Sequence, residues 1–483
     1  MINPVYLFLF VQNLRVTPTT CRHQHRRNIL LKSSARDTTE ADDASINLDN
    51  DENSDSPYVF KGKHKWLGGA INPADGSIFG IPSNVDSVIQ IQPGTVTQSG
   101  SADPTVRTIK LPSHMQKGQY KWLRGIVAHD HLYGIPAWSN EGVLKVSLTN
   151  HHDDDGNNIG VGTPTVLPIP TDANDSNSQN IKLCNVGGTE DDDLIEVRTD
   201  RWMWHGAALS ANEEYIYCIP SNKERVLKVK ADPLAQGPLV EEIGPRFHGQ
   251  NKWYGGIRGV DSCIYGVPYT ANGVLRIDPA DDSVTMIGDF GYGKYNWHGG
   301  VLAGNGCIYC FPSHSSHLLK IDTNLGVTDQ LSLIELPPTK DGVNNYKWLG
   351  GALGIDGAVY AMPCDTNSVL RIDPENDSVS IFGETPTGKN KWQGGVLGPD
   401  SCIYAVPADA ETVLKIDTRE IDISYGDDCN NDWRLSTVGS LPNVKKKWQG
   451  GFLASDGIIY AVSTNKEVVY IANTFNPFVL TLL

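Results

Sequence analysis

A Trp-x-Gly-Gly motif recurs eight times along this chain of 483 residues, and this repeat constrains the fold more than any other feature. Six copies match almost letter for letter. Two copies deviate: Arg124 replaces the first glycine after Trp122, and Ala207 replaces the second glycine after Trp204. A fixed period of this kind indicates an architecture built from one supersecondary unit per repeat. The repeated tryptophans are Trp66, Trp122, Trp204, Trp253, Trp297, Trp348, Trp392 and Trp448.

Two further patterns follow each tryptophan. The first is an apolar stretch with an aromatic residue three places before a proline, as in Tyr265 and Pro268, although the last copy has a serine in place of the proline. The second reads Val-Leu-Lys/Arg-Ile-Asp in its clearest copies, as at residues 274–278. A fourth apolar stretch, such as 283–287, usually comes next. Together with the Trp-x-Gly-Gly segment, these patterns predict four short strands in each unit.

We therefore predict an all-β fold, a β-propeller with eight four-stranded blades over residues 57–483, with seven blades as the alternative. The unit from Trp253 to Trp297 takes 44 residues, whereas a leucine-rich solenoid has a shorter repeat with one strand. The innermost strands of a propeller crowd together at the axis, which explains the paired glycines. We expect residues 58–60 to complete the last blade and lock the ring.

The segment GPDSCIYAVPADAETVLKIDT at 398–418 resembles the repeats of the broad propeller class that includes NHL, YVTN and streptogramin-lyase-like proteins. The likeness covers most of residues 57–483. It implies a platform, and platforms of this class carry enzymes, lectins and scaffolds alike.

The order of strands in a blade decides which loops share a face. The Lys-Trp corners and the loops after each proline are expected on one face. The opposite face is expected to take the insertions, the largest being an acidic loop near 150–193, with smaller ones at 94–106 and 419–434.

Residues 1–56 read as a disordered leader, with a basic stretch followed by an acidic one. Residues 1–36 contain six Lys/Arg and no acid, which partly fits a transit peptide, so organelle import is an alternative to a cytoplasmic location. Cys263, Cys307 and Cys402 occupy the same place in three blades, so we interpret them as buried, reduced thiols, which favour an intracellular compartment.

Charge excludes two classes of partner. The formal net charge is -16, and the six basic residues of 1–36 leave -22 for the remainder, a field that repels nucleic acid and anionic membrane. The longest apolar run, residues 5–11, is far shorter than the roughly 20 residues of a membrane-spanning helix. We expect a monomer with no cofactor. We also expect no metal site, because the two cysteines of Cys307-x-x-Cys310 lie along one strand and no second cysteine pair accompanies them.

The eight tryptophans have two interpretations. They fill the gaps between blades as wedges, or they form an aromatic ring on which sugars stack. A packing residue is needed in every blade, whereas a ligand rarely requires eight copies, so we favour wedges.

The residue after each tryptophan varies, and a binding site can be encoded at such a position. We interpret these residues, with two nearby arginines, as a candidate axial pocket, the alternative being plain lining of the axis. The candidates are Arg124, His205, Tyr254, Arg258, His298, Gln393 and Gln449.

Motifs for nucleophilic catalysis, phosphate binding or zinc hydrolysis are missing from the sequence. Our first hypothesis is a non-enzymatic binding platform for protein partners. The alternatives are a small-molecule hydrolase or lyase of the lactonase kind, with His205 and His298 as acid and base, and a carbohydrate-binding protein that uses the repeated tryptophans.

Overall fold

The computed structural model describes residues 62–482 apart from short internal segments. The segments left out are 98–99, 103, 140, 150, 153–157, 160–161, 171–180, 186–193, 199, 292, 294, 327–329, 420–433, 466–469 and 474–479. The expected leader at 1–56 and the expected closing strand at 58–60 lie outside the described residues.

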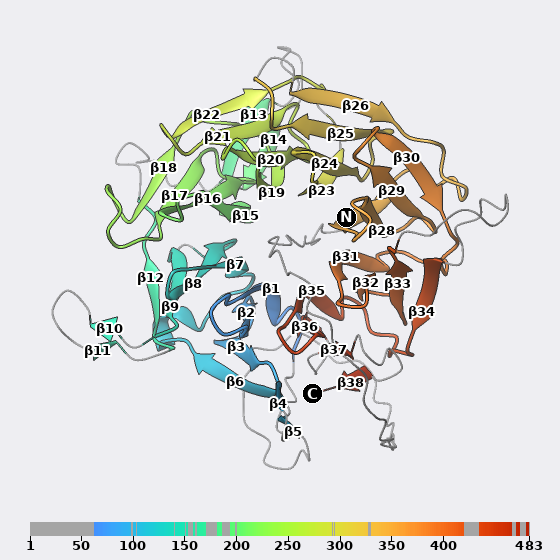
Figure 1. The fold of residues 1–483 in the computed structure, drawn as a ribbon. Helices are drawn as coiled ribbons and strands as arrows, with labels where there is room; N and C mark the ends of the chain where they lie inside the picture. The colour runs from blue at the N-terminus through green and yellow to red at the C-terminus, as the bar shows by residue number, and fades with distance from the viewer. Residues whose placement is uncertain are drawn as a thin grey trace.

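Eight four-stranded antiparallel sheets stand around a common axis as the blades of a propeller (Figure 1). The first strand of each blade is innermost, and these strands contact one another in cyclic order from β1 (Trp66–Ile71) to β35 (Trp448–Leu453) and back to β1. The predicted all-β propeller with eight blades is confirmed, and the alternative of seven is wrong.

The strands of each blade are given from the axis outward. Blade 1 comprises β1 (Trp66–Ile71), β2 (Ile78–Pro82), β3 (Ser87–Gln92) and β6 (Thr105–Lys110). Blade 2 comprises β7 (Trp122–Ala128), β8 (His131–Pro136), β9 (Val143–Ser147) and β12 (Pro164–Leu167). Blade 3 comprises β15 (Trp204–Leu209), β16 (Tyr215–Pro220), β17 (Val226–Lys230) and β18 (Val240–Ile243). Blade 4 comprises β19 (Trp253–Arg258), β20 (Ile264–Pro268), β21 (Val274–Asp278) and β22 (Ser283–Ile287).

The second half of the ring has the same order. Blade 5 comprises β23 (Trp297–Leu302), β24 (Cys307–Pro312), β25 (His317–Asp322) and β26 (Leu331–Glu335). Blade 6 comprises β27 (Trp348–Leu353), β28 (Val359–Pro363), β29 (Val369–Asp373) and β30 (Ser378–Phe382). Blade 7 comprises β31 (Trp392–Leu397), β32 (Cys402–Pro407), β33 (Val413–Asp417) and β34 (Leu435–Val438). Blade 8 comprises β35 (Trp448–Leu453), β36 (Ile458–Ser463), β37 (Tyr470–Asn473) and β38 (Leu480–Leu482).

Three small hairpins lie outside the blades, two of them in the acidic insertion of blade 2. They are β4 (Thr95–Thr97) with β5 (Gly100–Ala102), β10 (His151–His152) with β11 (Asn158–Ile159), and β13 (Ile181–Asn185) with β14 (Leu194–Arg198). One short 3-10 turn, η1 (Ser113–Met115), precedes blade 2. No helix among the described residues has the length and apolar character needed to cross a membrane.

The hydrophobic core is divided among the blade interfaces. Eight clusters of buried side chains each combine residues of two neighbouring blades, including blades 8 and 1, and each cluster contains one repeated tryptophan. The second strand of a blade is packed on both faces, so β20 is buried along its whole length. Stability therefore depends on eight similar interfaces.

The repeated tryptophans are 0–2% exposed, and their indoles lie between blades. In seven of them the Nε1–H donates to the carbonyl that opens the third strand, as from Trp348 to Ser368 O at 2.8 Å. This burial corrects the carbohydrate alternative, because a sugar has no access to these rings. The indoles act as wedges.

A lysine precedes the tryptophan in six blades, and in four of them its ammonium donates to carbonyls of the preceding blade: Lys121, Lys252, Lys347 and Lys391. Six such lysines are 0–4% exposed. Lys252 Nζ donates to Ser221 O at 2.7 Å and Lys223 O at 2.9 Å in the loop of blade 3, and Lys391 Nζ donates to Thr366 O at 2.8 Å in blade 6. Burial lowers the pKa of Lys391 to about 8. We call this contact the lysine clamp.

The first glycine of each motif forms a β-bulge on the innermost strand. Its φ lies between 70° and 87° in seven blades, a range that favours glycine, and the register between strands one and two shifts there in every blade. The second position is crowded, since a Cβ added to Gly69 would lie 2.2 Å from Phe79 O. The predicted crowding at the axis is therefore present.

Blade 8 is completed by β38 from the end of the chain. The expectation that residues 58–60 supply its fourth strand concerns residues that the structure does not describe. The ring closes through loop contacts: Lys65 N–H donates to Thr464 O at 3.1 Å, and His64 N–H donates to Asn465 Oδ1 at 2.7 Å. Among the residues that the structure describes, no strand is exchanged across this seam.

Candidate functional site

The residue two places before each repeated tryptophan has a left-handed backbone. Its φ lies between 48° and 65° in all eight blades, although none of the eight is glycine. A left-handed conformation costs an ordinary residue about 1–2 kcal/mol. We call these eight residues the rim ring, and they are His64, Tyr120, Trp202, Asn251, Tyr295, Tyr346, Asn390 and Lys446.

Hydrogen bonds from two blades hold Tyr120 of the rim ring in this conformation. Tyr120 N–H donates to Asn84 Oδ1 of blade 1 at 2.7 Å, and Tyr120 O accepts from Trp138 N–H of its own blade at 2.9 Å. The N–H groups of His64, Asn251, Asn390 and Lys446 make the same bond to an Asn or Asp of the preceding blade. The strain is therefore maintained by backbone contacts, and the side chains are not used for it.

Two stretches of the rim are aromatic, one at blades 2 and 3 and one at blades 5 and 6, with Asn251 of blade 4 between them. The rings of Tyr120 and Trp138 lie 4.6 Å apart, and those of Trp138 and Trp202 lie 5.6 Å apart, with the guanidinium of Arg201 4.4 Å above Trp138. His314 and Tyr346 lie 4.5 Å apart, edge to face. These rings are mostly half-buried. We call this group the aromatic sector, and it comprises Tyr120, Trp138, Trp202, Tyr295, His314 and Tyr346.

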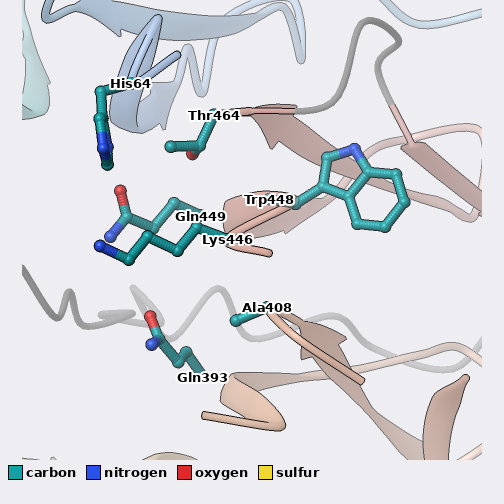
Figure 2. A pocket seen from close by; sticks show the side chains of 7 residues that line it. All are labelled: His64, Gln393, Ala408, Lys446, Trp448, Gln449 and Thr464. Carbon is teal, nitrogen blue, oxygen red and sulfur yellow. The ribbon is translucent and has the colours of Figure 1, made fainter. Parts of the chain in front are cut away.

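The other part of the rim is polar and contains a small pocket that is partly open to solvent. Blade 7 contributes Gln393, blade 8 contributes Lys446 and Gln449, and His64 closes the pocket from blade 1 (Figure 2). Burial lowers the pKa of His64 to about 4, and the charges of Lys446, Lys63 and Lys65 act in the same direction. We call this the seam pocket, and it is lined by His64, Gln393, Ala408, Lys446, Trp448, Gln449 and Thr464.

Near the axis, His205, Tyr254 and His298 are buried together. The rings of His205 and Tyr254 stack at 3.9 Å, and His298 meets Tyr254 edge to face at 5.0 Å. Burial holds the pKa of His298 well below its usual value, and the charges of His205, Arg124 and His314 add to this effect. His298 is therefore a neutral ring at pH 7.

Arg124 stands out on the innermost strands. It has φ 63° at the bulge position that glycine occupies in the seven other blades. It is 8% exposed, and a Cβ added to Gly206 of blade 3 would lie 3.3 Å from its Nη1. Burial lowers the pKa of Arg124 to about 9. Blade 2 thus places a strained, buried cation beside the histidines, a combination found at functional sites.

We expect Arg124→Gly to raise the free energy of unfolding by about 1 kcal/mol, because it removes the strained φ and a buried charge. Urea unfolding followed by far-UV circular dichroism measures this change. Arg124→Ala keeps the strained Cβ and should give a smaller gain than glycine. A loss of stability in Arg124→Gly would show that the guanidinium contacts outweigh the strain.

The structure divides the predicted site residues into three groups. Arg124, His205, Tyr254 and His298 lie together near the axis, whereas Gln393 and Gln449 line the seam pocket. Arg258 belongs to neither group, because its guanidinium donates at 2.9 Å to Leu209 O and Ser210 O of blade 3 at the far end of β19. It ties two blades together, so its predicted place in an axial pocket is not what the structure shows.

Several rim residues were missed by the sequence reasoning. The signal was present, because the residue two places before the repeated tryptophan is aromatic in Tyr120, Trp202, Tyr295 and Tyr346. No motif of residue types, however, predicts a left-handed backbone at a tyrosine. Among the residues that the structure describes, no three His, Cys, Asp or Glu side chains gather in a way suited to a metal ion.

Neither a family model nor a curated protein sequence matches the chain. Among solved structures, it is similar to a streptogramin B lyase at 12% identity, covering 88% of this chain and 96% of that one, with a TM-score of 0.45. It is also similar to virginiamycin B lyase from Staphylococcus aureus at 10% identity, covering 72% of this chain and 94% of that one, with a TM-score of 0.44. A third similar structure is hydrazine synthase of Kuenenia stuttgartiensis, at 14% identity, covering 71% of this chain and 92% of that one, with a TM-score of 0.44. The neighbours include the streptogramin-lyase-like propellers that the repeats resemble, and the likeness concerns the fold alone.

Proposed function

We propose that this propeller is a non-enzymatic binding platform and that its Lys-Trp face takes a protein partner. The observation that carries the proposal is the aromatic sector of the rim ring. Half-buried tyrosine and tryptophan rings with an arginine beside them have the composition of an interface core. The backbone of Tyr120 is held by hydrogen bonds from two blades, so little conformational entropy is lost at this residue when a partner binds.

The buried histidines support a binding role more than a catalytic one. A general acid or base works best when its pKa is near the operating pH. Burial holds the pKa of His298 well below that range. We therefore assign His205 and His298 to the structure of the axis in this proposal, and hydrolase or lyase activity is the alternative. A His205→Ala, His298→Ala double variant tests that alternative. If the variant lost hydrolase or lyase turnover while its free energy of unfolding stayed unchanged, the result would favour an enzyme.

Affinity capture with the full chain tests the platform. The test variant combines Tyr120→Asn, Tyr295→Asn and Tyr346→Asn, because asparagine already occupies the rim position as Asn251 and Asn390 and tolerates a left-handed backbone. We expect a stoichiometric partner with the natural chain and at least a tenfold lower yield with the variant, measured by quantitative mass spectrometry.

A matched control removes exposed apolar side chains from loops on the opposite face. Leu234, Leu239 and Ile355 are 85%, 53% and 62% exposed, and all three are changed to serine. This control should retain the partner. Capture that is insensitive to the three tyrosines, or that is lost in the control, would overturn the assignment of the binding face.

A further inference from the structure

The seam pocket combines donors and acceptors that the fold does not use. Gln449 is 6% exposed and Gln393 is 4% exposed. Gln449 Oε1 is buried and makes no hydrogen bond within the described structure, and neither does Nδ1 of His64. A buried polar atom without a partner costs free energy, so a site that keeps one is suited to a ligand that supplies the missing bond.

The pocket also contains a cationic side chain, Lys446. Figure 2 shows the Lys446 ammonium, the Gln449 amide and the His64 ring converging on one space, with the Gln393 amide facing them. Burial lowers the pKa of His64, and the charges of Lys446, Lys63 and Lys65 lower it further, so the ring is neutral at pH 7. The nearest acid, Asp409, accepts from Lys446 N–H at 2.7 Å and pairs with Lys445 Nζ at 3.4 Å. The Asp409 carboxylate is therefore held by these two lysines outside the pocket lining, whereas the Lys446 ammonium faces the pocket.

We propose that the seam pocket binds a small carboxylate that carries a neighbouring hydroxyl group. The carboxylate pairs with the Lys446 ammonium and accepts from the amide of Gln393. The hydroxyl donates to Gln449 Oε1, the buried acceptor. The pocket is partly open to solvent and its enclosed part has room for little more than a water molecule, so it takes the carboxylate and hydroxyl end of a small metabolite and excludes a folded chain.

The position of the pocket gives the ligand a second effect. Its walls come from blades 7, 8 and 1, and the boundary between blades 8 and 1 is the one place where neighbouring blades are not successive in the chain. A bound ligand therefore contacts blades 7 and 8 directly and lies against His64 of blade 1 across the seam. This site is separate from the aromatic sector and does not depend on the proposed protein partner.

Isothermal titration calorimetry with the full chain tests the proposal, using malate, lactate and gluconate as probes. Succinate, which lacks the hydroxyl, and glycerol, which lacks the carboxylate, are the comparison ligands. We expect at least one hydroxy acid to bind and to raise Tm. We expect succinate to bind at least tenfold more weakly than malate, because it leaves Gln449 Oε1 without a donor.

Lys446→Met should weaken binding at least tenfold. Lys445→Met is the matched control, since Lys445 is the adjacent lysine, 75% exposed, and should keep the affinity within twofold. Gln449→Glu, similar in size and acidic, should also abolish binding, and the Tm without ligand verifies folding of each variant. The triple tyrosine variant should bind the hydroxy acid normally.

Three outcomes would overturn the proposal. The first is the absence of binding by any hydroxy acid at a fixed ionic strength. The second is an equal loss in Lys445→Met and Lys446→Met, which would indicate general surface charge. The third is equal affinity for succinate and malate, which would remove the role of Gln449.

Discussion

Trp348→Ala is expected to lower the free energy of unfolding by about 3–5 kcal/mol, the cost typical of removing a large aromatic side chain from a core. Trp348 is fully buried between blades 5 and 6, packed against Phe311 and Leu370. Its Nε1–H donates to Ser368 O at 2.8 Å, so the variant also leaves a buried carbonyl without its donor. Guanidinium unfolding followed by far-UV circular dichroism measures the change.

Trp348→Phe separates packing from hydrogen bonding. It keeps much of the ring volume and loses the donor, and we expect a cost of about 1–3 kcal/mol. Trp138→Ala serves as the control, because Trp138 lies half-buried in a loop at the rim. Its loss should cost less than half as much as that of Trp348. A small effect at Trp348 would contradict the wedge role of all eight tryptophans.

Lys252→Met is expected to lower the free energy of unfolding by about 2–3 kcal/mol, because the carbonyls of Ser221, Lys223 and Gly249 lose a charged donor. Methionine fits this position, since Met203 occupies it in blade 3 and is 2% exposed. The loss therefore measures the lysine clamp with little change in packing. Urea unfolding at low and high salt gives the value.

Lys110→Met is the matched control for the clamp. Lys110 pairs with Asp86 at 2.5 Å, but its side chain is 59% exposed. Exposed ion pairs contribute about 0–1 kcal/mol and weaken in salt. We expect a small, salt-sensitive effect at Lys110 and a large, salt-insensitive one at Lys252. Equal effects would show that the buried carbonyls contribute nothing specific.

The blade could be predicted from sequence because its determinants are local and repeated. Strands, turns and the crowded glycines all depend on residues within about 44 positions of one another, and eight copies reveal the shared pattern. The bulge at the first glycine is one example. Arg124 was identified as a deviation from this pattern, which is why it entered the candidate site.

The arrangement of the site depends on ring closure, which the local pattern does not encode. His64 and Lys446 are 382 positions apart and meet only because blade 8 contacts blade 1. Arg258 carries the same chemistry as Arg124, yet its place at the end of β19 directs it to carbonyls of blade 3. Sequence distinguishes such residues only after each is placed along its strand.

The rim ring separates two roles that one residue usually has to combine. The N–H and C=O of Tyr120 fasten neighbouring blades, whereas its side chain is not needed for that purpose. Histidine, lysine, asparagine, tyrosine and tryptophan all occupy this position in one molecule. The ring therefore has eight positions at which the side chain can be changed while the backbone contacts between blades are kept. This property suits the fold both to evolutionary diversification and to the engineering of new binding proteins.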